Sequence, residues 1–209
     1  MKYTITIDKE QVNKMPVVSF EGEIIVVDTL SKVNSAVAHL RKLPLVGFDT
    51  ETRPSFKRGE RHPVALLQLG GEDLCFLFRM CKIGMPESLK KYLEDASCAK
   101  VGLSTHDDFN VMHRSYDFTP AGFIELQEMV KQYNIAELGL QKLYSILFNE
   151  KISKGQRLTN WEVAELSPSQ QRYAATDAWA CLRIYHRLTD GSFDPELSPY
   201  KHEITDEET

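Results

Sequence analysis

Two carboxylates stand directly after an apolar run that is typical of a buried central strand. Leu45–Phe48 is that run, and it leads into Asp49-Thr50-Glu51. Side chains at positions i and i+2 of a strand project from the same face, so Asp49 and Glu51 are expected side by side at the strand's end. Two such charges cannot both stay ionised at an apolar site unless a cation joins them. The alternative is a turn in which Asp49 only caps a loop.

Two further acids fall on predicted helices. Asp108 lies in the first turn of a helix expected over residues 106–112, where an acid also favours the helix dipole. Asp177 lies inside a long helix expected over residues 169–188, on its apolar side among alanines. Tyr173 precedes it by four residues and so shares its helix face. We infer that the four acids form one oxygen-rich cluster, which would select Mg²⁺ or Mn²⁺ over zinc.

Such a cluster indicates a particular chemistry. Two divalent ions about 4 Å apart stabilise both the attacking and the leaving oxygen of a phosphoryl displacement. Tyr173, on the same helix face as Asp177, would then hydrogen-bond the attacking water and hold it in line. The hypothesis is therefore a hydrolase of phosphate esters.

The order of the apolar segments predicts a single α/β domain. Strands are expected at residues 24–27, 45–48, 64–69, 74–78 and 99–103, with Gly70-Gly71 as a tight hairpin connection. Helices are expected at residues 31–43, with Ser31 as the N-cap, and at 86–93, 106–112, 138–148 and 169–188. The domain would span residues 21–190. Residues 1–20 form a polar, irregular N-terminal extension packed on it, and residues 191–209 form an acidic C-terminal tail.

The charge of the chain is unevenly distributed. The 209 residues contain 25 Lys and Arg against 30 Asp and Glu, a net charge of −5. Residues 194–209 hold six acids and one lysine, so they carry all of this net charge and the remainder is neutral. This balance excludes a protein that coats nucleic acid by bulk charge, but not one with a local nucleic-acid site. We expect residues 194–209 to be a frayed, solvated tail.

The cysteines and the apolar runs indicate in which cellular compartment the protein is expected. Four cysteines show neither a CxxC pair nor a zinc-ligand spacing, so neither zinc nor a disulfide framework is expected. The first residues lack the apolar run of a signal peptide, and no stretch approaches the ~18 apolar residues of a membrane span. The expectation is a cytoplasmic protein without a membrane segment.

Three segments of the chain resemble the motifs of the DEDD 3′→5′ exonucleases. The first is Val46-Gly47-Phe48-Asp49-Thr50-Glu51-Thr52, and the second is Lys100-Val101-Gly102 with Asp108 six residues after the glycine. The third comprises Thr159-Asn160-Trp161, Leu166, Gln170 and Tyr173-Ala174-Ala175-Thr176-Asp177-Ala178. Tyrosine four residues before the last aspartate resembles the DEDDy branch, which includes ribonuclease D and the exonuclease domain of the Werner helicase.

The resemblance implies a fold, a reaction and a role for each residue. The fold would be ribonuclease H-like, with a mixed β-sheet flanked by helices on both faces. Asp49, Glu51 and Asp177 would bind one metal ion, with Asp49 bridging to a second ion supported by Asp108. Tyr173 would orient the nucleophilic water, and Thr50 would lie near the terminal 3′-hydroxyl. The products would be nucleoside 5′-monophosphates. Asp107 competes for the role of Asp108; the spacing from Gly102 favours Asp108, and Asp107 would then point away.

Basic residues near these motifs are candidates for holding the substrate. The loop after the first motif contains Phe56 among several cations, and we assign substrate binding to Lys57, Arg58 and Arg61, together with Thr50. A second basic stretch contains Lys151, Lys154 and Arg157. Each cation could equally belong to a solvated loop, and Trp161 is expected to pack in the interior rather than stack on a base.

The leading hypothesis is a metal-dependent exonuclease that uses two ions, Mg²⁺ or Mn²⁺, on the 3′ end of a DNA or RNA single strand or frayed duplex. One alternative is a catalytically weak or inactive module that binds nucleic-acid ends. The presence of all four acids argues against it, because a pure binder has no need to hold repelling carboxylates together. The other alternative is a hydrolase of a small phosphodiester, against which the basic loops argue.

Overall fold

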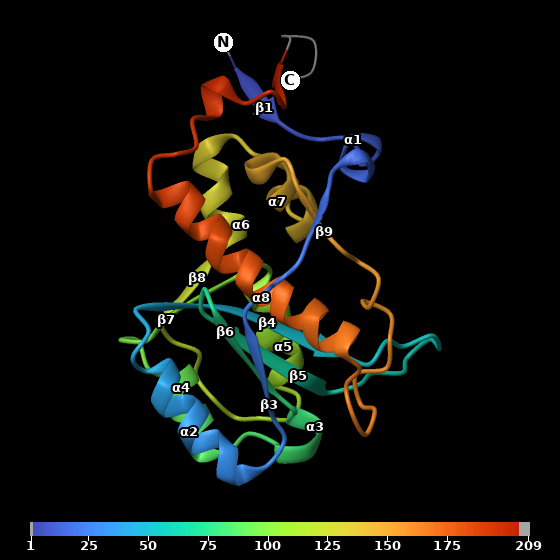
Figure 1. The fold of residues 1–209 in the computed structure, drawn as a ribbon, viewed down its shortest axis with the longest axis vertical. Coiled ribbons are helices and arrows are strands. Elements are labelled where there is room, and N and C mark those ends of the chain that lie inside the picture. Colours follow the sequence, from blue (N-terminus) through green and yellow to red (C-terminus); the bar gives the residue numbers. More distant parts are fainter. Residues whose placement is uncertain (1, 205–209) are drawn as a thin grey trace.

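A computed structural model describes residues 2–204 and contains one six-stranded mixed sheet (Figure 1). Its strands run in the spatial order β3-β6-β5-β4-β7-β8. Strand β4 pairs antiparallel with β5 and parallel with β7, so it lies at the centre of the sheet. The strands are β3 (Glu23–Val27), β4 (Leu45–Thr52), β5 (Val64–Gly70), β6 (Leu74–Phe78), β7 (Ala99–Gly102) and β8 (Phe123–Glu125).

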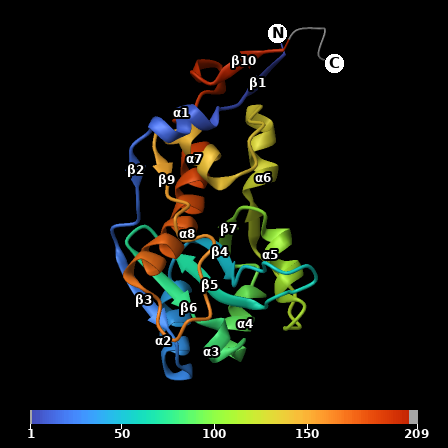
Figure 2. The same cartoon turned by 90° about the vertical axis from the view of Figure 1, so that its right-hand side faces the viewer.

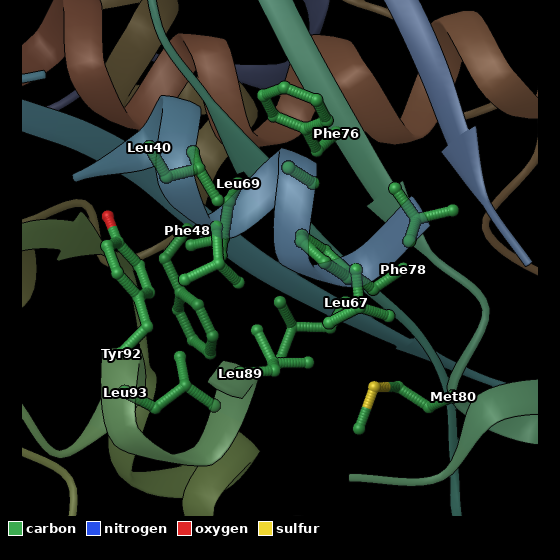
Figure 3. Packing of buried hydrophobic residues seen from close by; sticks show 14 of the residues in the cluster. Leu40, Phe48, Leu67, Leu69, Phe76, Phe78, Met80, Leu89, Tyr92 and Leu93 are labelled. Atoms are coloured by element: carbon green, nitrogen blue, oxygen red, sulfur yellow. The ribbon is translucent and has the colours of Figure 1, made fainter. Parts of the chain in front are cut away.

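Helices cover both faces of the sheet. The long helix α8 (Pro168–Thr189) crosses one face against β4, β5 and β6, with α7 (Leu140–Phe148) beside it. The opposite face carries α2 (Leu30–Leu40), α3 (Met80–Ile83), α4 (Glu87–Leu93) and α5 (Thr105–Met112). Figure 3 shows side chains of this second layer, among them Leu40, Leu89 and Tyr92, packed against Phe48 and Leu69 of the sheet. The predicted mixed α/β sheet flanked by helices is confirmed.

Helix α8 begins where its sequence dictates. Ser167 and Gln170 form a capping box, and Pro168 occupies the first turn, where its missing N–H has no intrahelical partner to lose. Its inner face is made of small residues, among them Ala174 and Ala178, which are fully buried against β5 and β6. These small side chains let the helix approach the sheet closely, which brings any polar side chain on the same face to the end of β4.

Gly47 marks the closest approach of α8 to the sheet. A Cβ atom built on Gly47 would lie 1.8 Å from the carbonyl oxygen of Ala178. The contact is with backbone, so no side-chain rotation relieves it. Glycine at this position is therefore required by packing, two residues before Asp49 in the same strand.

We expect Gly47→Ala to destabilise the fold by about 3 kcal/mol or more, because overpacking must push α8 away from β4. For a chain of this size that loss lowers the melting temperature by roughly 6–12 °C, which thermal unfolding would measure. Gly139→Ala is the matched control, since nothing lies within 4 Å of its Cβ position. Equal melting temperatures for the two variants would contradict the close packing of α8 on β4.

The structure corrects the description of residues 1–20 as irregular. They form β1 (Tyr3–Ile5), α1 (Lys9–Lys14) and β2 (Val17–Val18). Strand β2 pairs with β9 (Lys151–Ile152), and the segment runs along one side of the molecule before entering β3 (Figure 2). Ile5, Ile7 and Val12 are buried in the cluster beneath α7 and α8. Tyr3, Ile5 and Ile7 alternate with polar residues, which is the period of a strand and was overlooked in the sequence, and tertiary packing orders the rest of the segment.

Part of the expected acidic tail is also ordered. Residues 195–204 include the 3₁₀ turn η2 (Pro195–Leu197) and β10 (Lys201–Glu203), which pairs antiparallel with β1. Tyr200 is buried, and Lys201 pairs with Glu196. The frayed tail predicted from charge is therefore wrong for these residues, because backbone pairing with β1 outweighs their polarity. Residues 205–209, with the remaining acids of the prediction, lie outside the described residues.

The other element boundaries differ in detail from those expected. Helix α2 takes Thr29 rather than Ser31 as its N-cap residue. Between β3 and α8 the short elements α3, β8, α6 (Leu126–Met129), η1 (Val130–Tyr133, a 3₁₀ turn) and β9 were not predicted. Among residues 2–204, no helix combines the length and apolarity that a membrane crossing requires.

Candidate active site

Three carboxylates meet where the end of β4 faces α8. One carboxylate oxygen each from Asp49, Glu51 and Asp177 lies within 4.8 Å of the other two. Asp49 and Glu51 project from the same face of β4, as the i, i+2 spacing predicts. Asp177 comes from the alanine-rich face of α8, which Gly47 allows close to the strand. Three of the four predicted acids are thus brought together by a strand and a helix distant in sequence.

The environment of this acidic cluster, Asp49, Glu51 and Asp177, opposes ionisation. Burial, reinforced by the charge of Asp177, raises the pKa of Asp49 well above its ordinary value. Burial and the neighbouring acids raise the pKa of Glu51 to about 10. Burial raises the pKa of Asp177 to about 7, although a hydrogen bond from Tyr173 works in the opposite direction. Without a cation, the three side chains therefore hold protons that isolated carboxylates would release.

The donor set fits a divalent cation. Magnesium prefers carboxylate oxygens at about 2.1 Å in octahedral geometry, which places its ligand oxygens about 3–4 Å apart. The 4.8 Å span of the acidic cluster needs only a small side-chain adjustment to reach that spacing. An all-oxygen set is also the one that hard ions such as Mg²⁺ and Mn²⁺ prefer. A bound cation would reverse the repulsion that raises these pKa values.

Asp108 lies beside the acidic cluster but outside the group of three. Thr50 Oγ1 donates a hydrogen bond to Asp108 Oδ1. Burial and the charge of Asp49 raise the pKa of Asp108 to about 8, while the Thr50 hydroxyl lowers it. Asp107 is exposed to solvent. Of the two adjacent acids, only Asp108 is therefore placed to interact with the cluster.

Helix α5, which carries Asp108, is held in place by a residue that was not predicted. Glu125, at the end of β8, accepts hydrogen bonds from the backbone N–H groups of Ser104 and Thr105 and from the Thr105 hydroxyl. A carboxylate at the N-terminus of a helix satisfies free N–H groups and complements the helix dipole. No spacing in the sequence links residue 125 to residue 104, so only the fold reveals this contact.

Tyr173 stands one helical turn before Asp177 and faces the same space. Its hydroxyl lies close enough to the Asp177 carboxylate to lower the pKa of Asp177, and the centroid of its ring lies 5.9 Å from that of Trp161. Burial, together with the charge of Asp177, raises the pKa of Tyr173, so the hydroxyl stays protonated. Trp161 is fully buried, which confirms its predicted packing role. Tyr173 is therefore a fixed hydroxyl at the edge of the acidic cluster.

The acidic cluster opens into a cleft of about 320 Å³ that is lined by two cations as well as by the three acids and Tyr173. The cations are Lys154 and Arg157, from the loop after β9. The charge of Arg157 lowers the pKa of Glu51, and that of Lys154 lowers the pKa of Asp177. Lys154 and Arg157 belong to the second basic stretch of the sequence, which was a candidate for holding the substrate but was not among the residues assigned to binding. The assigned residues Lys57, Arg58 and Arg61 are exposed on the β4–β5 loop and do not line the cleft.

Gln68 is a second residue that the sequence did not single out. It pairs with Asp49 across the β4–β5 ladder, so both side chains project toward α8. Gln68 is fully buried, and neither atom of its amide has a hydrogen-bond partner among residues 2–204. A buried, unpartnered amide costs stability, and here it adjoins a carboxylate of the acidic cluster.

We expect Gln68→Met to raise the melting temperature by a few degrees, because removing an unsatisfied buried amide recovers about 1–3 kcal/mol. Gln170→Met is the matched comparison. Gln170 accepts from Ser167 N and donates to Thr159 Oγ1 and to the Asn160 carbonyl, each at 3.1 Å. Its loss should lower the melting temperature. If both variants lowered the melting temperature equally, the Gln68 amide would have to form hydrogen bonds in the folded protein.

Comparison with known proteins identifies the class to which this fold and site belong. The exonuclease domain of Nibbler from Aedes aegypti superposes with a TM-score of 0.73 at 20% identity, covering 86% of this chain and 96% of that one. Escherichia coli RNase D superposes with a TM-score of 0.71 at 23% identity, covering 81% and 44%. The fold is thus the ribonuclease H-like fold of exonucleases, as the resemblance implied.

Sequence comparison gives the family. The sequence profile of the 3′-5′ exonuclease family matches residues 24–191. Exonuclease 3′-5′ domain-containing protein 2 of Drosophila melanogaster is 35% identical over 75% of this chain and 27% of its own length. The bifunctional 3′-5′ exonuclease/ATP-dependent helicase WRN of Mus musculus is 35% identical over 69% of this chain and 11% of its own length. The chain belongs to the DEDD-type 3′-5′ exonuclease family, a group of hydrolases that act on nucleic acids. It matches only about a quarter or less of the length of these two relatives.

Proposed function

We propose that the protein removes nucleotides from the 3′ end of a DNA or RNA strand in a reaction that requires two divalent ions, Mg²⁺ or Mn²⁺. The observation that carries the proposal is the acidic cluster, held within 4.8 Å beside Tyr173 in an open cleft. Two cations line the same cleft, which suits a phosphodiester rather than a neutral substrate. The products would be nucleoside 5′-monophosphates.

Each polar side chain has a proposed role. Asp49, Glu51 and Asp177 would hold one ion, and Asp108 would support a second beside Asp49. When bound, such ions neutralise charge on the phosphate oxygens and lower the pKa of a water molecule. The Tyr173 hydroxyl keeps its proton beside the Asp177 carboxylate, and its lone pairs would accept a hydrogen bond from the attacking water and align it. Lys154 and Arg157 would bind the scissile phosphate.

The residues assigned to substrate binding in the sequence keep more distant proposed roles. Because the Thr50 hydroxyl donates to Asp108, we assign it the orientation of that carboxylate as well as proximity to the 3′-hydroxyl. Lys57, Arg58 and Arg61, exposed on one loop, would attract the phosphate backbone further from the end. All four cysteines are free, which fits the reducing compartment of the proposed cytoplasmic location.

An end-labelling experiment tests the function. Single-stranded DNA and RNA labelled at either end are incubated with the protein and Mg²⁺ or Mn²⁺, beside an Asp49→Ala variant. We expect a 5′-labelled strand to shorten progressively and a 3′-labelled strand to release its label as a mononucleotide at once, with neither change in the variant. Binding without cleavage would favour the end-binding module. Cleavage of a small phosphodiester but not of either strand would favour the small-substrate hydrolase.

Tyr173→Phe is expected to reduce turnover about a hundredfold, because a positioned group that orients the reacting water contributes roughly 10²–10⁴. The ring and its packing on Trp161 remain, so the fold should be retained. Initial rates at saturating substrate measure the loss, and the shift in melting temperature on adding Mn²⁺ measures metal binding. Loss of the Mn²⁺ shift would contradict the role assigned to Tyr173.

A further inference from the structure

A second pocket adjoins the cleft, between the two basic loops. It has a volume of about 380 Å³ and is lined from the β4–β5 loop by Arg53, Phe56, Lys57 and His62, and from the loop after β9 by Leu158 and Asn160. The β4–β5 loop and the segment after β9 extend on the same side of the molecule (Figure 1). We call this feature the two-loop pocket.

The two-loop pocket displays apolar side chains to solvent. Phe56 is 80% exposed and Leu158 is 68% exposed. Among the other exposed apolar residues, Val17 lines a depression that it shares with Tyr173 of the cleft. Phe56 and Leu158, two of the six large apolar side chains exposed among residues 2–204, line one pocket together. Exposed apolar groups gathered at one place mark a binding surface.

The charge around Phe56 is positive and largely uncompensated. Residues 53–62 contain four Arg and Lys against one acid, Glu60. Arg53 pairs with Glu162 at 3.4 Å, but Lys57, Arg58 and Arg61 have no ion-pair partner among residues 2–204. An aromatic ring among free cations suits a polyanion that carries flat apolar groups, which is the composition of an unpaired nucleic-acid strand.

The two-loop pocket lies close to the point of reaction. Arg53 follows Glu51 of the acidic cluster by two residues, which span about 7 Å of extended chain. On the second loop, Leu158 directly follows Arg157 of the cleft. A strand whose 3′ end lies at the carboxylates therefore reaches the pocket within its first few nucleotides.

We propose that the two-loop pocket is a stacking site in which Phe56, supported by Leu158, binds an unpaired base a few nucleotides from the 3′ end. The proposal rests on the proposed function and narrows its substrate to strands whose terminal nucleotides are unpaired. In a duplex the faces of the bases are covered by their neighbours, so Phe56 has nothing to stack on. Phosphates flanking the bound base would face Lys57 and Arg58.

Abasic substrates combined with Phe56 variants test the site. Binding is measured with the metal removed by chelation, by fluorescence anisotropy of a labelled single strand in which one base at a time is deleted near the 3′ end. We expect that deleting the base at one such position weakens binding to the wild type about tenfold, because this is the contribution of one base stacked on an aromatic side chain. Phe56→Ala should bind the intact strand about tenfold more weakly and lose its sensitivity to that abasic position. Phe56→Trp should restore both.

Matched controls separate this site from the exonuclease proposal. Leu197→Ala removes a side chain that is 81% exposed but lies in η2, and it should change neither binding nor cleavage. Phe56→Ala should raise KM for a long strand while leaving kcat and the cleavage of a dinucleotide unchanged.

Three outcomes would contradict one of the two proposals. If the wild type cleaves strands, but the losses of affinity caused by the abasic position and by Phe56→Ala simply add, the stacking site is wrong and the exonuclease proposal stands. If the wild type cleaves neither DNA nor RNA, the proposed function fails instead. Equal affinity of wild type and Phe56→Ala for the strand would overturn the site and leave Phe56 to a protein partner.

Discussion

Asp49→Asn is expected to lower the rate of 3′-end shortening by about a thousandfold or more while the fold remains intact. Asp49 belongs to the acidic cluster, and in the proposed mechanism it contacts both ions. A metal ion supplies several kcal/mol of charge stabilisation in the transition state, and each 1.36 kcal/mol corresponds to a factor of ten in rate. The substitution keeps the shape of the side chain and replaces a buried carboxyl group, whose ionisation the site opposes, by a neutral amide, so the metal-free protein should be at least as stable as the wild type.

The measurement is the initial rate on a 5′-labelled single strand with Mn²⁺, together with thermal unfolding in the presence of a chelator. Asp107→Asn and Asp108→Asn form a matched pair, because the two acids are adjacent but only Asp108 accepts a hydrogen bond from Thr50 and has its pKa raised by the charge of Asp49. We expect Asp107→Asn to cleave at the wild-type rate and Asp108→Asn to lose activity. A wild-type rate for Asp49→Asn would mean that the cluster is not the reaction site.

The centre of the site followed from local sequence because short-range geometry determines it. Strand periodicity places Asp49 and Glu51 on one face, and helical periodicity places Tyr173 with Asp177. Only the meeting of β4 and α8 had to be inferred, and the alanines of α8 indicated where the helix could come close. The apolar strands β4 to β6 and the long helix α8 were predictable for the same reason, since each carries its own period or continuous run.

Features that depend on tertiary packing were not predictable. The alternation of Tyr3, Ile5 and Ile7 indicates a strand, but the partners of β1 and β2 lie far along the chain, so no local pattern identified β10 and β9 as the strands that order residues 2–20. Strand β8 has three residues, too few to show alternation. Substrate binding was assigned to cations of the loop after the first motif, yet Lys154 and Arg157 reach the cleft because β9 and β2 hold their loop there. The cross-strand position of Gln68 became visible only with the register of β5.

The metal-free protein is expected to lose stability as the pH rises, and divalent ions should remove this loss. In the folded state the pKa values of Asp177, Asp108 and Glu51 are raised to about 7, about 8 and about 10, whereas unfolded carboxyls titrate near 4. Between these limits the folded protein binds more protons than the unfolded chain, so its free energy of unfolding falls with increasing pH. The stabilising contribution is complete below pH ~4 and is lost as the pH passes through the raised values.

Thermal unfolding between pH 5 and 8.5 measures this effect, with a chelator and with Mn²⁺. Each proton held only by the folded state contributes up to about 1.4 kcal/mol per pH unit, or roughly 4 °C per unit for a chain of this size. Mn²⁺ binds the deprotonated carboxylates of the folded state, so its stabilisation should grow as the pH rises and cancel the decline.

Asp49→Asn distinguishes the effect of the acidic cluster from that of the other acids, because it removes one of the groups whose charge raises the pKa values of Glu51 and Asp108. In chelator, the melting temperature of Asp49→Asn should therefore fall less steeply with pH than that of the wild type. Mn²⁺ should raise the melting temperature of this variant only slightly. A wild-type melting temperature that rose with pH in chelator would show that these carboxylates are ionised without a cation, and the argument for a metal centre from their mutual repulsion would then fail.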